Sequence, residues 1–213
     1  MALSANGARA AIGLSDGRGL VFDSSSAGLS PLAQLDLASP VLVGETPIAA
    51  AASYTRCCGE RLIWQTQNTH VPFGSAQAAN RAPAAHRGAN VLTVTDLDGR
   101  AQWKYRGPFS LSGAWCDAPA EGSPRWLAVA CRELPGAAEA GQFGALLFDL
   151  STDDAAGARG GAERLTYYYP THGPLLAGGD VGPDGRLLAI VETPAPTPDG
   201  QRLYGTHQVH IVR

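Results

Sequence analysis

Charged side chains are scarce in this sequence. Asp, Glu, Lys and Arg make up 16% of its 213 residues, and the formal net charge is −3. Surfaces that bind nucleic acid are usually strongly basic, so we expect no nucleic-acid partner. No run of about 18 apolar residues occurs, so no hydrophobic helix of membrane-spanning length is expected. Clean helical periodicity is also lacking over stretches longer than about ten residues, so the sequence predicts an all-β fold.

The first seven residues lack both a charged region and an apolar run. A secretory leader needs both, so none is expected in this chain. A cytoplasmic location is then the default expectation, on the condition that Met1 is the natural start. A longer natural chain stays open as the alternative.

The four cysteines, Cys57, Cys58, Cys116 and Cys131, show no zinc-binding pattern. No pair has the two-residue gap of a zinc knuckle, and histidines do not cluster around them. On a strand, Cys57 and Cys58 point to opposite faces and cannot share a ligand. We therefore expect buried thiols, with no metal and no other cofactor. A disulfide involving Cys116 and Cys131 is the alternative if the protein is extracytoplasmic.

Glycine and proline are abundant, with 26 and 15 copies, and four short segments resemble one another. Each combines turn residues, an arginine and a short apolar run. They occupy residues 6–12, 58–64, 123–129 and 184–190. Their arginines define a unit of about 50 to 65 residues. A repeat of this length with strand-type content is typical of radially repeated β architectures.

The same order of strands recurs within the units. After the arginine-led run, a second apolar run ends in an aspartate, which is Asp23, Asp96 or Asp149 in the first three units. A further run and a link to a strand of small residues follow. Four antiparallel strands in the order A (inner), B, C and D (outer) form a β-propeller blade. A β-sandwich is the main competitor, but it does not require the same order in every unit.

The sequence therefore predicts an all-β protein, a β-propeller of four-stranded antiparallel blades. About four blades are expected in one domain, residues 1–213, and they are expected to be part of a larger ring. The expected units are residues 1–43, 44–107, 108–170 and 171–213.

Two motifs carry a resemblance to known propellers. Residues 182–190, GPDGRLLAI, resemble the SPDG-K/R-x-L/I-A signature of TolB-type propellers, and residues 163–166, ERLT, resemble the x-x-L-T that closes their blades. The match covers the last two units well, whereas CCGE at residues 57–60 replaces Pro-Asp-Gly in the second. The resemblance implies a six- to eight-bladed binding platform, or the non-catalytic domain of a prolyl-oligopeptidase-like enzyme. It also implies a periplasmic location.

The last unit ends without a D strand, since residues 207–212 correspond to strand C. WD-repeat-like propellers close their ring in this way, with an N-terminal strand supplying the missing D strand. We expect the chain to be the C-terminal part of a larger propeller. Completion by another chain and a bare four-bladed ring are the alternatives.

Two motifs that look catalytic have structural interpretations. Residues 13–17, GLSDG, match the G-x-S-x-G nucleophile elbow, but a strand follows them instead of the required helix, so we expect a hairpin turn. Asp96 and Asp98 could begin a calcium loop, but Gly107 occupies the twelfth position, where glutamate is needed. A strand-end role is expected for Asp96, as for the other repeated aspartates.

Long B–C connections mark the expected working face. They comprise residues 66–90, 132–142 and 192–204, and they emerge beside the D–A link at residues 169–172. Long surface loops often carry function. The expected binding residues are His70, Phe73, Arg81, His86, Arg87, Tyr169 and His172. The bland alternative is a passive, Ala-rich insertion.

Tyr167, Tyr168 and Tyr169 form the densest aromatic cluster. Strand alternation places Tyr167 and Tyr169 on one face and Tyr168 on the other. Packing between blades is favoured over a binding hot spot for this cluster.

The favoured function is a non-enzymatic scaffold that mediates protein–protein interaction or complex assembly. Its expected partners are another protein or the remaining blades of the ring. The alternative is a propeller hydrolase or lactonase with its site at the tunnel mouth near Asp117 and Asp180, which end two successive A strands. Partner identity and blade number stay open.

Overall fold

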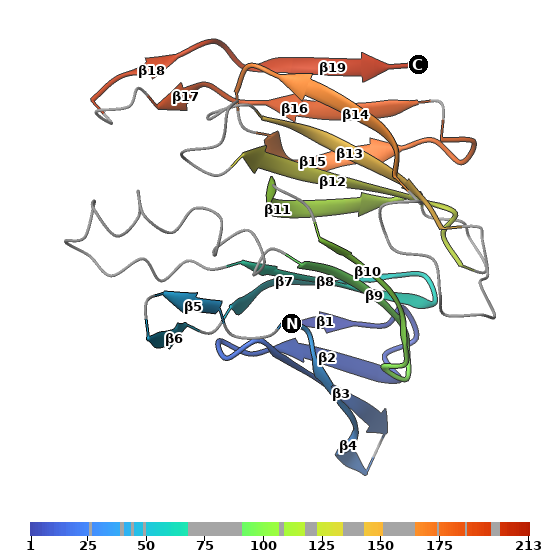
Figure 1. Cartoon of the computed structure of the whole chain (residues 1–213). Helices are drawn as coiled ribbons and strands as arrows, with labels where there is room; N and C mark the ends of the chain where they lie inside the picture. The colour runs from blue at the N-terminus through green and yellow to red at the C-terminus, as the bar shows by residue number, and fades with distance from the viewer. Residues whose placement is uncertain are drawn as a thin grey trace.

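The repeat folds into four antiparallel sheets that follow one another along the chain. Figure 1 shows the computed structural model, with the first sheet at the bottom of the view and the last at the top. The structure describes residues 1–25, 27–38, 41–43, 45–48, 50–67, 91–106, 109–117, 123–133, 143–150, 165–173, 175–185, 187–196 and 201–213.

Each of the first two sheets has four strands. The first has the order β1-β2-β3-β4, with strands Ala2–Leu3, Arg9–Gly13, Arg18–Ser25 and Gly28–Asp36. The second has the order β7-β8-β9-β10, with strands Ala51–Cys58, Arg61–Gln67, Val91–Asp96 and Ala101–Arg106. Between them lies a short ribbon of β5 (Val41–Val43) and β6 (Thr46–Ile48).

The third sheet repeats this plan, and the fourth has three described strands. The third has the order β11-β12-β13-β14, with strands Phe109–Cys116, Trp126–Glu133, Phe143–Asp149 and Leu165–Thr171. The fourth has the order β15-β16-β19, with strands Leu175–Val181, Leu188–Glu192 and Gln208–Val212. A ribbon of β17 (Ala195–Pro196) and β18 (Leu203–Tyr204) lies in the connection from β16 to β19.

The predicted order of strands is confirmed in all four sheets. The inner strands β1, β7, β11 and β15 lie next to one another in succession. The all-β prediction is confirmed as well, and the described residues contain no helix of the length and apolar character that a membrane crossing needs. The ribbon of β5 and β6 spans residues 41–48 and so extends across the expected boundary at residue 43.

Turn chemistry and strand register explain the repeated sequence. Gly7, Gly59 and Gly185 occupy the A–B turn of three units with φ angles of +70°, +55° and +70°, which only glycine adopts readily. Antiparallel pairing then places the repeated arginine and aspartate side by side, as in the pairs Arg9 with Asp23 and Arg61 with Asp96. The expected strand-end position is confirmed for Asp96 and Asp149, which end β9 and β13, whereas β3 continues for two residues beyond Asp23.

Among the described residues, the largest cluster of buried apolar side chains lies between the second and third sheets. The Phe148 ring lies between two aromatic side chains of β10, with centroid distances of 5.5 Å to Trp103 and 5.0 Å to Tyr105. Leu92, Val94, Leu127, Val129 and Leu146 are buried in the same cluster. We call such an interface between neighbouring sheets a seam.

Smaller seams join the other neighbouring sheets. The first and second sheets bury Ala11, Val21, Leu37, Leu62 and Trp64 between them. The third and fourth bury Trp115, Trp126, Ala128, Ala130, Ala145, Leu147, Val181, Leu188 and Ile190. Sheets two and three are thus covered on both faces, so the first five residues of β9 and the first six of β13 are all buried.

The tyrosine cluster follows the predicted alternation. Tyr168 packs into the seam with the second sheet, and Tyr169 packs into the seam with the fourth. The rings of Tyr167 and Tyr169 lie on one face at 6.4 Å. The expectation that these rings pack between blades is confirmed for Tyr168 and Tyr169, whereas Tyr167 is 42% exposed.

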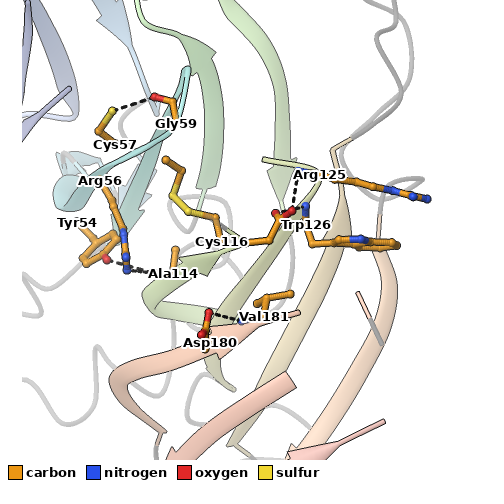
Figure 2. The surroundings of a disulfide bond; sticks show 12 residues. Tyr54, Arg56, Cys57, Gly59, Ala114, Cys116, Arg125, Trp126, Asp180 and Val181 are labelled. Atoms are coloured by element: carbon orange, nitrogen blue, oxygen red, sulfur yellow. Dashed lines mark hydrogen bonds between the residues drawn. A yellow bond between two sulfur atoms is a disulfide. The ribbon is translucent and has the colours of Figure 1, made fainter. Parts of the chain in front are cut away.

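The prediction of buried thiols was wrong for Cys58 and Cys116, because a disulfide joins them. Cys131 is a buried thiol, as expected. Both cysteines end inner strands of neighbouring sheets, with their Cα atoms 6.2 Å apart (Figure 2). Cys131 cannot reach Cys116 because it lies opposite Leu111, whereas Cys116 lies opposite Leu127. As expected, Cys57 points to the other face, and burial raises the pKa of its thiol.

Side chains of β7 and β8 reinforce the disulfide by bonding to backbone carbonyls of β11. Tyr54 and Arg56 donate to Ala114 O at 3.2 and 2.8 Å (Figure 2). Gln65 donates to Gly113 O at 3.0 Å and is fully buried. The second and third sheets are therefore joined by a covalent bond and by side-chain hydrogen bonds at their inner strands.

Replacing Phe148 with alanine should lower the free energy of unfolding by about 3–5 kcal/mol, because a fully buried ring leaves a cavity at the seam. Denaturant unfolding of the purified chain measures this loss. Tyr167→Ala removes a comparable but exposed ring and should cost far less. Equal losses for the two variants would contradict the packing described for Phe148.

The Cys58→Ala/Cys116→Ala double variant should lose about 4 kcal/mol of stability, because the disulfide closes a loop between residues 58 positions apart. Peptide mapping without reductant checks the pairing, and denaturant unfolding measures the loss. Cys57→Ser, which leaves the disulfide intact, is the matched control. Recovery of Cys116 as a peptide linked to Cys131 would refute the assignment.

Candidate functional site

Two of the seven predicted binding residues lie in the described part of the chain. Tyr169 is near the end of β14, and His172 is in the link from β14 to β15. The other five lie outside the described residues; they are His70, Phe73, Arg81, His86 and Arg87. The site is therefore built from Tyr169, His172 and the side chains that surround them.

Tyr169 begins a hydrogen-bonded chain that crosses from the third sheet to the fourth. Its hydroxyl lies 3.1 Å from Nδ1 of His210, a residue of β19. The Nε2 atom of His210 lies 2.6 Å from Oε2 of Glu192, the last residue of β16. The Tyr169 and His210 rings also meet edge to face, with centroids 5.6 Å apart.

Glu192 is the buried end of this chain, with only 3% of its surface exposed. Its second oxygen, Oε1, accepts a hydrogen bond from the Gly173 amide at 2.6 Å. A histidine with one proton on Nε2 donates to the carboxylate and accepts from the tyrosine hydroxyl at Nδ1. Each polar atom of the three side chains then has a partner, as burial requires.

The same contacts hold the link that carries His172. Thr171 is 8% exposed, and its hydroxyl donates to Gly173 O at 2.9 Å. Gly173 is also buried and is anchored by Glu192. His172 is therefore exposed between two buried neighbours, so its backbone is fixed while its imidazole is presented at the surface.

Sequence reasoning missed Glu192 and His210 as members of this site. His210 lies on β19, outside every segment expected to bind a partner. The usable signal was Glu192, an ionisable residue at the end of a run whose alternate positions are buried. A buried carboxylate needs hydrogen-bond donors. Gln208 is the cross-strand partner of Glu192, and His210 lies two residues further along β19, on the same side of the strand.

Asp117 and Asp180, proposed for the hydrolase alternative, have local structural roles. Asp117 is 6% exposed, and its two oxygens accept the Trp126 and Arg125 amides at 2.7 and 3.3 Å (Figure 2). Asp180 is exposed, and its Oδ1 accepts the Val181 amide at 2.9 Å (Figure 2). These contacts explain both carboxylates as strand-end acceptors.

The two catalytic-looking motifs are turns. The Asp16 carboxylate in GLSDG accepts the Arg18 amide at 3.1 Å between β2 and β3, so the hairpin prediction is confirmed. Asp96 Oδ1 accepts the amides of Asp98 and Arg100 at 3.0 and 2.8 Å, which closes the turn between β9 and β10. Asp98 in turn is 3.0 Å from the Arg9 guanidinium of the first sheet.

A polar groove of about 520 Å³ lies at the opposite ends of the strands. Its lining includes Arg9, Glu60, Asp98 and Ser123. Arg9 pairs with both Asp23 and Asp98 there, at 2.8 and 3.0 Å. Because Arg9 already pairs with Asp98 of the neighbouring sheet, we interpret these charged side chains as part of the contact between the two sheets.

Comparison with solved structures identifies the class of fold. The chain is similar to the Dos1 propeller, with 12% identity and a TM-score of 0.55 over 90% of this chain and 41% of that chain. It also matches the Cps50 (Swd1) β-propeller domain of Myceliophteria thermophila, with 11% identity and a TM-score of 0.49 over 90% of this chain and 47% of that chain. A putative 6-phosphogluconolactonase from Bacteroides fragilis matches with 13% identity and a TM-score of 0.37 over 99% of this chain and 72% of that chain.

The chain is a partial β-propeller, and its blades are WD-repeat-like. It spans less than half the length of the Dos1 and Swd1 chains that it matches. No protein-family profile and no curated protein sequence matches it. The similarity to the Dos1 propeller supports the fold only, and the TolB-type resemblance stays a prediction.

Replacing Glu192 with alanine should lower the free energy of unfolding by about 3 kcal/mol, because the Gly173 amide and His210 then lose their buried acceptor. Tyr169→Phe removes one hydroxyl and should cost about 1 kcal/mol. His172→Ala is the control and should have an effect below about 0.5 kcal/mol, since the side chain is exposed. Denaturant unfolding that ranks His172→Ala above Glu192→Ala would contradict the described network.

Proposed function

We propose that the protein is a non-enzymatic β-propeller scaffold that mediates protein–protein interaction or complex assembly. The proposed contact surface is the face where the link from β14 to β15 and the B–C connections emerge. The observation that carries the proposal is the presentation of His172, an exposed side chain on a link anchored from below by Glu192 and Thr171.

A rigid support is what a recognition surface needs. A side chain on a fixed backbone loses little conformational freedom when it binds, so more of the contact energy appears as affinity. The Tyr169–His210–Glu192 chain supplies this rigidity from within the seam. The binding residues expected on residues 70–87 would extend the same surface.

The hydrolase alternative has no comparable support among the described residues. Such an enzyme needs carboxylates that are available to a substrate or to a metal at the inner-strand ends. Both oxygens of Asp117 instead accept backbone amides. Asp180 is exposed, but one carboxylate does not form such a set, so the scaffold is the better supported of the two functions.

The His172→Glu variant should bind its partner about tenfold more weakly than the wild type, because a contact at the centre of an interface contributes on the order of 1–2 kcal/mol. The immobilised chain first captures partners from source extract, and calorimetry with the purified partner then gives the affinity. Gln34→Glu is the matched control, because it adds the same charge at an exposed position on β4, outside the link and the B–C connections.

Unchanged affinity for His172→Glu, with a normal melting temperature, would reject the proposed surface. Loss of binding by both His172→Glu and Gln34→Glu would indicate a general charge effect and would also count against it.

A further inference from the structure

The outer face of the last sheet is apolar, and no other described part of the chain covers it. Pairing of β16 with β19 places Ala189 opposite Ile211 and Val191 opposite Val209 on this face. Val209 is 68% exposed and Ile211 is 57% exposed. The alternate residues of the same strands point the other way, into the seam with the third sheet, as His210 does. Large exposed apolar patches of this kind mark contact surfaces.

The same positions are buried in the third sheet. The repeat aligns Ala128 with Ala189, and their cross-strand partners are Leu147 and Ile211. Ala128 and Leu147 are 0% and 6% exposed, because the fourth sheet covers them. The last sheet therefore has the residues of a seam without the sheet that would cover them.

The first sheet has the other half of a seam. Pairing of β2 with β3 places Ala10 opposite Phe22 and Ile12 opposite Leu20. Their neighbours Ala11 and Val21 face the second sheet, so these four side chains lie on the opposite, outer face, where Ala10 is 4% exposed and Ile12, Leu20 and Phe22 are half-buried. Leu3, the partner of Ala10 on β1, extends this outer face and is 57% exposed.

The two outer faces are complementary in kind. Every seam in the chain joins two types of sheet face. The first type is the face of a sheet that points toward the following sheet in the chain, and the second type is the face of that following sheet that points back toward it. The last sheet offers the first type of face, and the first sheet offers the second type. No seam in the chain joins two faces of the same type. Within one chain the two outer faces lie at opposite ends of the stack of sheets (Figure 1).

We propose that two copies of this chain form one closed ring of eight sheets. In this ring the outer face of the last sheet of each copy packs against the outer face of the first sheet of the other. Propellers commonly have four to eight blades, so eight sheets fit one ring. The proposal goes beyond the proposed function, because it uses the sheet faces and not the His172 surface.

Closure by two copies has a physical advantage over an open chain of copies. The dimer forms two identical seams at once, and the second is an intramolecular event once the first exists. Head-to-tail contacts that do not close would instead grow into filaments. A closed pair also covers both apolar faces, which lowers the exposed apolar area of each copy.

Sedimentation and light scattering of the purified chain test the proposal. The wild type is expected at twice the chain mass of 22.0 kDa at micromolar concentrations. The last-face variant, Val209→Lys/Ile211→Lys, should be monomeric because it places two charges in the seam. The first-face variant, Leu3→Glu/Leu20→Glu, should be monomeric for the same reason.

An equimolar mixture of the two variants provides the decisive measurement. A dimer of one copy of each has one wild-type seam and one seam in which lysines face glutamates, so dimers should return. Gln201→Lys/Thr206→Lys adds the same charge at exposed positions off the outer face and should remain dimeric. His172→Glu should also remain dimeric, which separates this test from that of the proposed function.

Four results would overturn the proposal. A wild-type monomer would show that the faces do not bind a second copy, whether or not another protein covers them. Dimers lost only by the last-face variant would indicate contact of like faces. Filaments or larger species would indicate an open assembly, and failure of the mixture to dimerise would exclude the reciprocal pairing. Leu3→Glu alone, at an exposed position, replaces the first-face variant if circular dichroism shows that Leu20→Glu unfolds the chain.

Discussion

The packing of each sheet against the next is the constraint on which the rest of the structure depends. A sheet with apolar side chains on both faces cannot bury them alone and needs a neighbour on each side. The second and third sheets have both neighbours, and Trp64 and Phe148 are completely buried there. The first and last sheets have one described neighbour each, and exposed leucine, valine and isoleucine side chains appear on their outer faces.

Ion pairs, hydrogen bonds and a disulfide also join neighbouring sheets, and they differ in how deeply they are buried. The Arg9 pairs with Asp23 and Asp98 are partly exposed and contribute modestly to stability. The disulfide from Cys58 and the chain that ends at Glu192 are more deeply buried. Both link neighbouring sheets, so the candidate site is part of the seam that supports it. The recognition proposed for His172 would then depend on how firmly the third and fourth sheets are held together.

Much of the fold could be predicted because its causes are local. Turn glycines, the arginine at or just before the start of each B strand, and the aspartate at or near the end of the first three C strands fall at similar positions in the repeat. Strand alternation likewise assigned Tyr168 and Tyr169 to different seams. Less of the site could be predicted. Tyr169 and His172 were found from the position of the link, whereas Glu192 and His210 became part of the site only through contacts across a seam.

The sequence by itself determined the order of the strands within the four sheets, because a period of two and the conformational demands of turns act over a few residues. Tertiary structure decided which cysteine pairs with Cys116, which side chains meet Tyr169 and which sheet faces stay uncovered. These outcomes join residues 41 to 58 positions apart, as in the Tyr169–His210 and Cys58–Cys116 pairs. Their distances depend on how one sheet is rotated against the next, and no local pattern in the chain specifies that rotation.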